Sequence, residues 1–308
     1  MSDQDEQANE VEDLERVFND ACAKPIKIAY EVLKSITKSF AQEIGSGAFG
    51  VVYLGELQNG MVAVKKIMTI DLSDEQYLDE VACLIMLKHK NIVRFLDSHG
   101  KVMEMGNKFI IAEERERLLC FEYAPNGNLH HYLSDKNRAC VWHTRYKIIK
   151  GICQGLHYLH KEHINHFDLK PENVLLGEHF GLSRNFGGGR STIVTKNIFG
   201  TPGYIAPEFF QTGQISSKSD IYSLGQIMKK LLLGSETTEN WYESLDEDCP
   251  LLKKCIEIAK ICDNSDPKER PTIDYILDQL NDTEAMIQMV PITIYEPRND
   301  PASSLYKV

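Results

Sequence analysis

Three glycines mark the part of the sequence that could do chemistry. They stand as Gly45, Gly47 and Gly50 in the run GSGAFG, and Lys65 follows fifteen positions after the last of them. Glycine lets backbone N–H groups approach a phosphate closely, and a lysine ammonium neutralises phosphate charge. A dinucleotide-binding turn shares this glycine spacing, but it needs a strand before the glycines and a helix after them. Residues 51–54 alternate like a strand instead, so we expect the glycines to cap a hairpin that binds phosphate.

This pairing resembles the glycine-rich loop and the lysine strand of the protein kinases, with the lysine in the run VAVK. In that family a glutamate on the next helix pairs with the lysine and holds it on the phosphates. The resemblance gives this role to Glu80, fifteen positions after Lys65. Asp79 is the neighbouring competitor, but the apolar residues at 81 and 84–87 orient the helix face in favour of Glu80.

The run at 118–129 narrows the resemblance to plant receptor-like kinases. It implies that Phe121 is the gatekeeper residue and that residues 122–124 form the adenine-binding hinge. The resemblance as a whole implies ATP as a cofactor, contacted by Ile44, Gly45, Ser46, Gly47, Gly50, Val52, Ala63, Lys65, Glu80, Phe121, Glu122, Ala124 and Leu175.

Residues 164–176, INHFDLKPENVLL, resemble the catalytic loop of the protein kinases. The resemblance implies that Asp168 orients the substrate hydroxyl and accepts its proton, that Lys170 stabilises the transferred phosphoryl group, and that Asn173 ligates Mg²⁺. A lysine two residues after the aspartate is typical of serine/threonine kinases. Later segments agree: Asp220 resembles the aspartate that braces this loop, and Arg270 resembles the arginine that pairs with the glutamate of Ala-Pro-Glu, here at position 208.

One departure from the family pattern is Phe167, which stands where an arginine usually precedes the catalytic aspartate. That arginine binds a phosphorylated activation segment. The sequence therefore resembles the non-RD kinases, and we expect phosphorylation of Ser191, Thr192 or Thr195 to have a weak switching effect.

A second departure concerns the metal. His179 stands where the family has the aspartate of Asp-Phe-Gly, and it follows Asn173 by six positions, about half the family spacing, so we expect the intervening hairpin to be missing. Magnesium takes hard oxygen ligands, whereas imidazole suits softer metals. Glu178 is the one nearby carboxylate, but an extended backbone would point it away from the side that His179 faces unless the chain kinks at Gly177. We expect a weakened or non-standard Mg²⁺ site.

Two functions stay open. The first is an ATP-dependent serine/threonine protein kinase of signalling, an enzyme that transfers phosphoryl groups to protein hydroxyls with activity weakened by loss of the metal-binding aspartate. The alternative is a catalytically dead pseudokinase that acts as a nucleotide-binding or scaffolding module. A dinucleotide enzyme is disfavoured because the glycines do not stand in a βαβ unit.

The elements that must position these residues fall into two groups. Alternating runs around a turn at 58–60, with strands at 92–96 and 118–123 and a helix at 78–87, form the first third. Helical patterns at 142–161, 218–233, 250–262 and 272–280 form the rest. This order predicts an α+β class and the bilobal protein kinase fold, with a small antiparallel β-sheet lobe plus one helix and a larger, mostly helical lobe.

We expect an acidic, flexible leader over residues 1–29, a kinase domain over 30–285, and a loose tail over 286–308. Within the domain, we expect an N-terminal lobe at 38–122 and a C-terminal lobe at 127–285. The leader follows from charge, because residues 1–20 contain eight acidic residues and one base, Arg16.

The net charge of −11 argues against nucleic acid as a partner. No apolar run is long enough for a membrane span, and the eight cysteines show no close Cys-x-x-Cys pair, which is typical of reduced thiols. We therefore expect a cytoplasmic chain whose partners are ATP and a protein substrate or signalling partner, with membrane receptors as further candidates.

Overall fold

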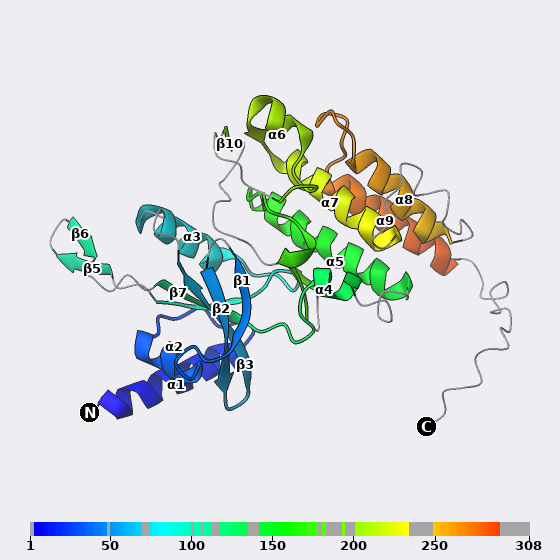
Figure 1. The fold of residues 1–308 in the computed structure, drawn as a ribbon. Coiled ribbons are helices and arrows are strands. Elements are labelled where there is room, and N and C mark those ends of the chain that lie inside the picture. The colour runs from blue at the N-terminus through cyan, green and yellow to red at the C-terminus, as the bar shows by residue number, and fades with distance from the viewer. Residues whose placement is uncertain are drawn as a thin grey trace, which may run out of the picture.

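The computed structural model describes residues 3–47, 50–68, 74–99, 102–105, 108–111, 117–134, 142–177, 180–182, 193–194, 201–233 and 249–289. A strand-rich N-terminal part is followed by a helix-rich C-terminal part (Figure 1). This arrangement confirms the predicted α+β, bilobal fold.

A five-stranded antiparallel sheet forms the centre of the N-terminal lobe. Its strand order is β1 (Glu43–Gly47), β2 (Gly50–Leu57), β3 (Gly60–Ile67), β7 (Arg117–Glu122) and β4 (Phe95–His99). The strands β2 and β3 form a hairpin closed by residues 58–59, as their alternation predicts. The segment between β4 and β7 contains a further strand pair, β5 (Val102–Met105) with β6 (Lys108–Ile111).

Alternate residues of the sheet face two different hydrophobic clusters. Val62, Val64, Leu118 and Cys120 pack with helices α1 (Asp3–Asn19) and α2 (Tyr30–Ile36). Ile67, Leu119 and Phe121 pack on the other face, with Tyr77, Val81 and Leu84 of α3 (Asp74–Met86). Because successive side chains of a strand point to opposite faces, Lys65 lies on the same face as Ile67, which is the face that α3 covers.

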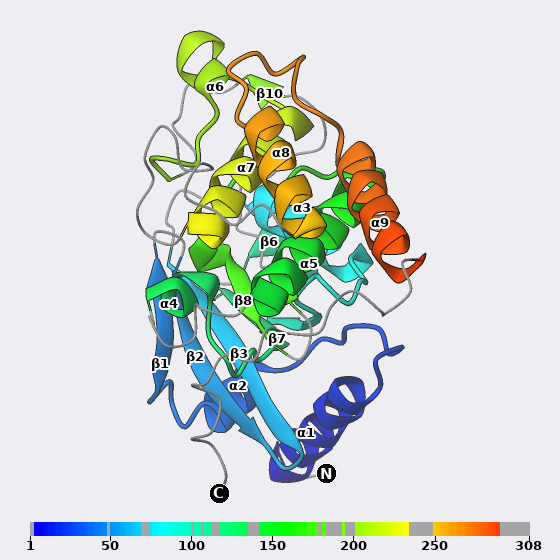
Figure 2. The ribbon, with the colours of Figure 1, turned by 90° about the vertical axis from the view of Figure 1, so that its right-hand side faces the viewer.

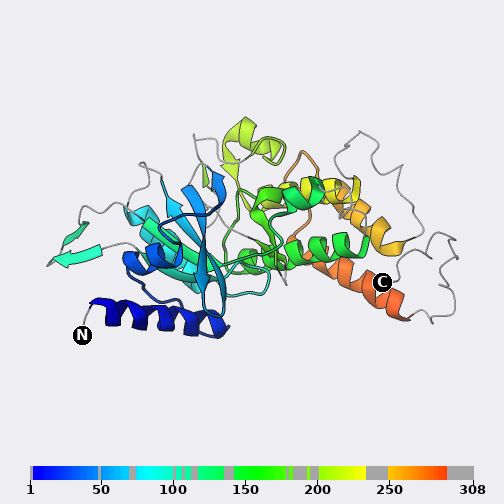
Figure 3. The ribbon, with the colours of Figure 1, turned by 60° about the horizontal axis from the view of Figure 1, so that its bottom comes forward.

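The acidic leader is not a flexible segment over Asp3–Asn19, and that prediction is wrong. Leu14 and Val17 of α1 are buried, and Val11 and Phe18 pack on the same cluster. These four residues lie on one stripe of the helix, so the stripe is buried while Asp5, Glu6 and Glu12 stay exposed. In Figure 3 this helix, dark blue beside the N-terminus, lies along the N-terminal lobe. The packed unit therefore begins before residue 38, the predicted start of the N-terminal lobe.

The C-terminal lobe is built around α5 (Trp142–Lys161), which packs against α7 (Ser217–Leu233) and α9 (Ile273–Met289) (Figure 2). Helix α8 (Pro250–Cys262) packs on α7 and α9. The shorter elements are α4 (Leu129–Ser134), α6 (Pro207–Thr212), the 3₁₀ turn η1 (Pro171–Asn173), and the strands β10 (Ile193–Val194) and β11 (Gln214–Ile215). Because α9 continues to Met289, the tail does not begin at residue 286 as predicted, and 290–308 lie outside the described residues.

The hairpin that the short spacing was expected to delete is present in a compressed form. Strand β8 (Val174–Leu176) pairs directly with β9 (Phe180–Leu182), with Leu176 opposite Phe180 and Leu175 opposite Gly181. The prediction of a missing hairpin is therefore wrong, because three-residue strands joined by a short connection suffice for pairing. The compression places the Phe-Gly dipeptide inside a strand.

Candidate active site

One row of the sheet carries the predicted phosphate-binding residues. Gly45 of β1 is opposite Val52 of β2, and Val52 is opposite Lys65 of β3. Residues directly opposite one another share a face of the sheet, so these three positions line one face. Helix α3, which contains Glu80, covers that face next to the row. The side chain of Glu80, and so its predicted ion pair with Lys65, lies outside the described residues.

The glycines of this hairpin have different structural roles. A side chain added at Gly45 or at Gly47 would meet no atom within 4 Å, so their backbone groups can be approached by a ligand. Gly50 has a φ of +143°, and a Cβ there would lie 2.1 Å from the carbonyl oxygen of Lys66. Gly50 is therefore required by the fold, whereas the space beside the two earlier glycines is open. Ala48 and Phe49, at the tip, lie outside the described residues.

The predicted hinge connects the sheet to the C-terminal lobe. Phe121 is opposite Ala63 of β3, and Glu122 is opposite Val62. Beyond the hinge, the Leu176 N–H donates to the Gly127 carbonyl at 2.8 Å, and the Asn126 N–H donates to the Leu176 carbonyl at 3.1 Å.

Leu175 forms an isolated β-bridge with Asn128, which lies four residues beyond Ala124. The structure therefore brings Leu175 next to the segment that follows the hinge. Ile44 and Ser46 lie on β1, beside Gly45. The predicted ATP-contacting residues thus come from β1–β3, from α3, from the end of β7 with the residues just after it, and from β8.

The predicted catalytic residues form one polar cluster. Asn173 Nδ2 donates to both the carboxylate of Asp168, at 2.9 Å, and its backbone carbonyl, at 2.7 Å. Lys170 Nζ lies 3.1 Å from Asp168 Oδ2 and 2.7 Å from the Thr201 hydroxyl. Thr201 in turn lies 3.5 Å from Asp168 Oδ1. A carboxylate is thus held beside an ammonium and a hydroxyl, an arrangement that can receive a proton and stabilise developing negative charge.

A buried aspartate fixes the backbone just before this cluster. Asp220 of α7 accepts the N–H of His166 and the N–H of Phe167, each at 2.8 Å, and lies 2.9 Å from His160 Nε2. Burial alone would raise the pKa of Asp220, but the hydrogen bond and positive charge of His160, with the contribution of His166, hold that pKa below its usual value. Phe167 has a φ of +63°, a strained conformation for a bulky residue. The two N–H bonds to Asp220 offset that strain.

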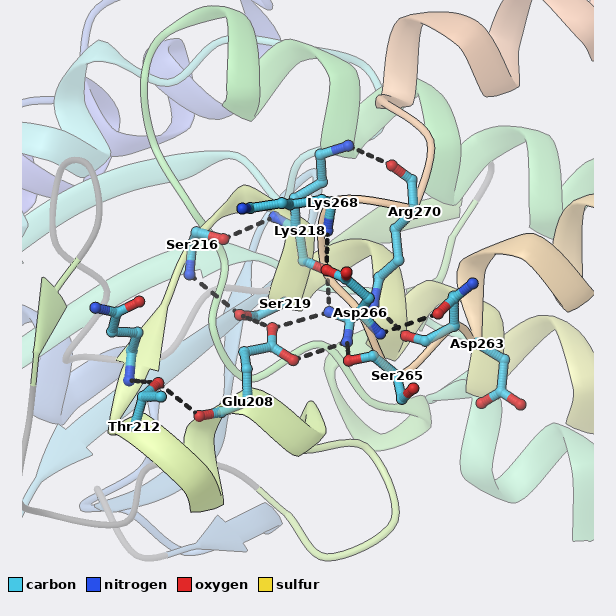
Figure 4. A network of polar contacts seen from close by, with 12 residues as sticks. Glu208, Thr212, Ser216, Lys218, Ser219, Asp263, Ser265, Asp266, Lys268 and Arg270 are labelled. Atoms are coloured by element: carbon cyan, nitrogen blue, oxygen red, sulfur yellow. Dashed lines mark hydrogen bonds and ion pairs between the residues drawn. The ribbon is translucent and has the colours of Figure 1, made fainter.

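A second buried pair holds the segment that follows Thr201. Arg270 donates to both oxygens of Glu208, at 2.8 and 2.7 Å, which confirms the predicted pairing (Figure 4). Ser219 Oγ also donates to Glu208, and Arg270 reaches the carbonyls of Asn264 and Lys218. This network joins α6, α7 and the loop that follows α8. The network thus gives hydrogen-bond acceptors to the N–H groups of the Arg270 guanidinium, which is fully buried.

Thr201, which the sequence places in a kinase-like Gly-Thr-Pro-Gly run, completes the polar cluster. The structure also identifies a contact that sequence reasoning missed. His160 holds Asp220 from within α5, with no motif of its own. A small cavity opens beside the cluster, lined by Phe167, Asp168, Thr201, Tyr204, Ile205 and Ser223 among others.

The predicted metal site is incomplete in the described residues. Asn173 Nδ2 donates to the carboxylate and to the backbone carbonyl of Asp168, so this side chain is already tied to the catalytic loop. Among the described residues, no group of three His, Cys, Asp or Glu side chains could hold a metal ion. Glu178 and His179 lie outside the described residues.

The chain resembles known proteins over most of its length. A family described as "Protein kinase domain" matches residues 39–280. A G-type lectin S-receptor-like serine/threonine-protein kinase of Arabidopsis thaliana is 34% identical over 286 residues, covering 80% of this chain and 34% of that relative. Cysteine-rich receptor-like protein kinase 27 of Arabidopsis thaliana is 33% identical over 294 residues, 82% of this chain and 44% of its own length.

A rice relative, cysteine-rich receptor-like protein kinase 6 of Oryza sativa subsp. japonica, is 34% identical over 287 residues, which cover 79% of this chain and 40% of the relative. The chain therefore spans between a third and a half of the length of these relatives. Within the described residues, no helix is long and apolar enough to cross a membrane.

Proposed function

Because this chain belongs to the protein kinase family, we propose that it binds ATP between the Gly45–Val52–Lys65 row and the hinge, and that it transfers phosphoryl groups to protein serine or threonine only weakly. The observation that carries this proposal is the cluster of Asp168, Lys170, Asn173 and Thr201. It contains a proton acceptor, a cation and a hydroxyl within hydrogen-bond range of one another. The chain is similar to a receptor-like serine/threonine-protein kinase, and this similarity supports the same reaction class.

The chain's own residues support the following roles in transfer. The substrate hydroxyl oxygen bonds to the γ-phosphorus as the bond to the leaving ADP oxygen breaks, and Asp168 receives the hydroxyl proton. Lys170, held between Asp168 and Thr201, places its ammonium where negative charge increases. Lys65, on the row that includes Gly45, supplies positive charge for the other phosphates.

The donor set does not fit a full Mg²⁺ site. Magnesium requires near-octahedral oxygen coordination, and protein carboxylates usually supply one or two of its ligands. Asn173 offers an amide oxygen, and the aspartate of the family pattern is replaced by His179. The pairing of Phe180 with Leu176 further supports a changed geometry at this position. We therefore propose weak transfer with little dependence on magnesium for nucleotide binding.

A pseudokinase remains the second candidate. His179 in place of the aspartate is the observation that favours it, since loss of a metal ligand would leave the nucleotide site but remove most transfer. Under this alternative the chain would act as a nucleotide-binding or scaffolding module.

We propose a cytoplasmic signalling role, with a protein substrate and membrane receptors as partners. Support comes from the relatives, which are named receptor-like kinases, and from the cysteines, because the seven in the described residues are free thiols. The net charge of −11 does not favour nucleic acid.

An ATP titration followed by thermal shift, with and without Mg²⁺, tests the binding part of the proposal. Lys65→Ala should abolish the ATP-dependent shift. Lys66→Ala is the matched control, because Lys66 lies on the opposite face of the same strand and contacts the Phe40 ring. Absence of an ATP effect on the wild-type chain, with or without the metal, would contradict the proposal.

A further inference from the structure

Helix α1 is anchored to the N-terminal lobe at three separate places. Glu10 accepts the N–H of Ala29 at 2.7 Å, just before α2, and Glu15 accepts the N–H of Gln58 at 2.8 Å, in the β2–β3 turn. The Phe18 ring fills the space beside Gly60, where an added Cβ would lie 2.5 Å from the ring. With Leu14 fully buried, these contacts dock α1 on the sheet face opposite Lys65.

The C-terminal end of α1 is also held by Arg94, which directly precedes β4. Its guanidinium donates to the carbonyls of Phe18 at 3.3 Å and Asp20 at 2.6 Å, and also to that of Val17. The last carbonyls of a helix have no partner within it and carry the negative end of the helix dipole. Arg94 therefore caps α1 with both hydrogen bonds and charge.

The backbone of the same residue is bonded to the hinge. The Arg94 N–H donates to Glu122 Oε1 at 2.9 Å, and the Glu122 N–H donates to the Arg94 carbonyl at 3.0 Å. Glu122 is the last residue of β7 and the first of the predicted hinge. One residue thus contacts the end of α1 through its side chain and the start of the hinge through its backbone.

From these contacts we propose that Arg94 is a positioning residue, which couples the docking of α1 to the conformation of the hinge and so to nucleotide affinity. The inference rests on the proposed function in one respect, that Glu122 begins the segment that holds adenine. The mechanical part, coupling of α1 to the hinge, stands on the contacts alone. A guanidinium that bonds three carbonyls fixes its own backbone, and that backbone then fixes Glu122 from both its N–H and its carboxylate.

Hydrogen–deuterium exchange of the peptide spanning 117–124, measured on the full chain without nucleotide, tests whether the docking of α1 is coupled to the hinge. Arg94→Ala should raise its exchange rate about ten-fold. Arg94→Lys should give an intermediate rate, because an ammonium keeps the charge but not the planar fork. If Arg94→Ala does not fold, Arg94→Lys alone decides, and a wild-type rate in that variant overturns the proposal.

Arg145→Ala is the matched control. Arg145 caps the end of α7 in the same manner, through the carbonyls of Leu231 and Leu232, but lies in the other lobe. It should lower stability while leaving hinge exchange within about two-fold of wild type. An equal change of hinge exchange in the Arg94 and Arg145 variants would overturn the proposal, since both would then report general loosening.

A second variant tests whether α1 is the transmitting element. Leu14→Glu undocks α1 at the middle of its buried stripe, without touching Arg94, and should reproduce the hinge effect of Arg94→Ala. If α1 carries the coupling, the double variant should exchange no faster than either single variant. If the double variant instead raises the hinge exchange rate by the product of the two single effects, Arg94 and α1 act on the hinge independently, and the proposed coupling is overturned.

Calorimetric titration with ATP then reads the functional consequence. Arg94→Ala should weaken ATP binding about five-fold relative to wild type, and Arg145→Ala should not. If wild type binds no ATP, the proposed function fails, while the exchange data still decide the coupling. Faster hinge exchange with unchanged ATP affinity would overturn the link to nucleotide binding.

Discussion

Arg270 and Glu208 form a two-pronged ion pair in which the arginine side chain is fully buried. The pair joins the loop after α8 to the start of α6, which follows the segment containing Thr201. Removing one partner of a buried pair leaves the other charge without compensation.

Arg270→Ala should therefore lower the free energy of unfolding by about 3–5 kcal/mol. Urea denaturation measures this. Lys254→Ala is the control, because Lys254 pairs with the exposed Glu257 one turn along α8, and its loss should cost about 0.5 kcal/mol or less. Equal losses for the two variants would contradict the role given to the buried pair.

The three glycines of the β1–β2 hairpin should respond differently to alanine. Gly50→Ala should destabilise the fold by about 2 kcal/mol or more, because its Cβ would collide with the Lys66 carbonyl. Gly47→Ala, which meets no atom within 4 Å, should leave stability nearly unchanged but weaken ATP binding. Thermal unfolding and ATP titration of both variants separate the two roles. If neither variant binds ATP more weakly than wild type, the result would argue against a phosphate site at this hairpin.

Burial of Leu14 predicts that α1 contributes to global stability. Leu14→Ala should cost about 2–4 kcal/mol in the free energy of unfolding, because it opens a cavity in the cluster shared with α2 and the sheet. Gln7→Ala, on the exposed side of the same helix, should have almost no effect. A negligible cost for Leu14→Ala would mean that α1 is undocked in solution.

Asp220 gives a pH-dependent contribution with a definite sign. Its pKa is depressed in the folded state, so the unfolded chain binds the proton more readily. Its stabilising contribution is complete above the unfolded pKa of about 4 and is lost as pH falls through the lower folded value.

Asp220→Asn should be less stable at neutral pH, and the gap to wild type should narrow below about pH 4. Unfolding free energies of both chains across that range measure it. Asp274→Asn, at an exposed carboxylate, is the control and should leave a small, flat difference. If the difference in unfolding free energy between wild type and Asp220→Asn stays constant over this pH range, the protonated Asp220 stabilises the fold as well as the ionised one, and the prediction is wrong.

Much of the fold could be predicted from local pattern. The alternation around residues 58–60 fixed the β2–β3 hairpin, and the helix periods at 142–161 and 250–262 match α5 and α8. The Glu208–Arg270 pair was predictable from its two motifs. These cases share a strong periodic signal or a fixed pair of residue types.

Other features depend on tertiary contacts that leave little local signal. Helix α1 was misread because its acidic composition outweighed an apolar stripe of four residues, and burial against a sheet distant in sequence decides the outcome. Arg94 was missed because its partners are backbone carbonyls, which any residue can supply. The β8–β9 hairpin was missed because the spacing argument assumed the longer family connection.

The most direct test of the central claim is a phosphoryl-transfer assay on an acceptor protein and on the chain itself, comparing wild type with His179→Asp and Asp168→Asn. We predict that wild type transfers slowly, that Asp168→Asn removes the remaining transfer, and that His179→Asp raises the rate about ten-fold or more. A wild-type rate already equal to that of His179→Asp would contradict the account of the metal site.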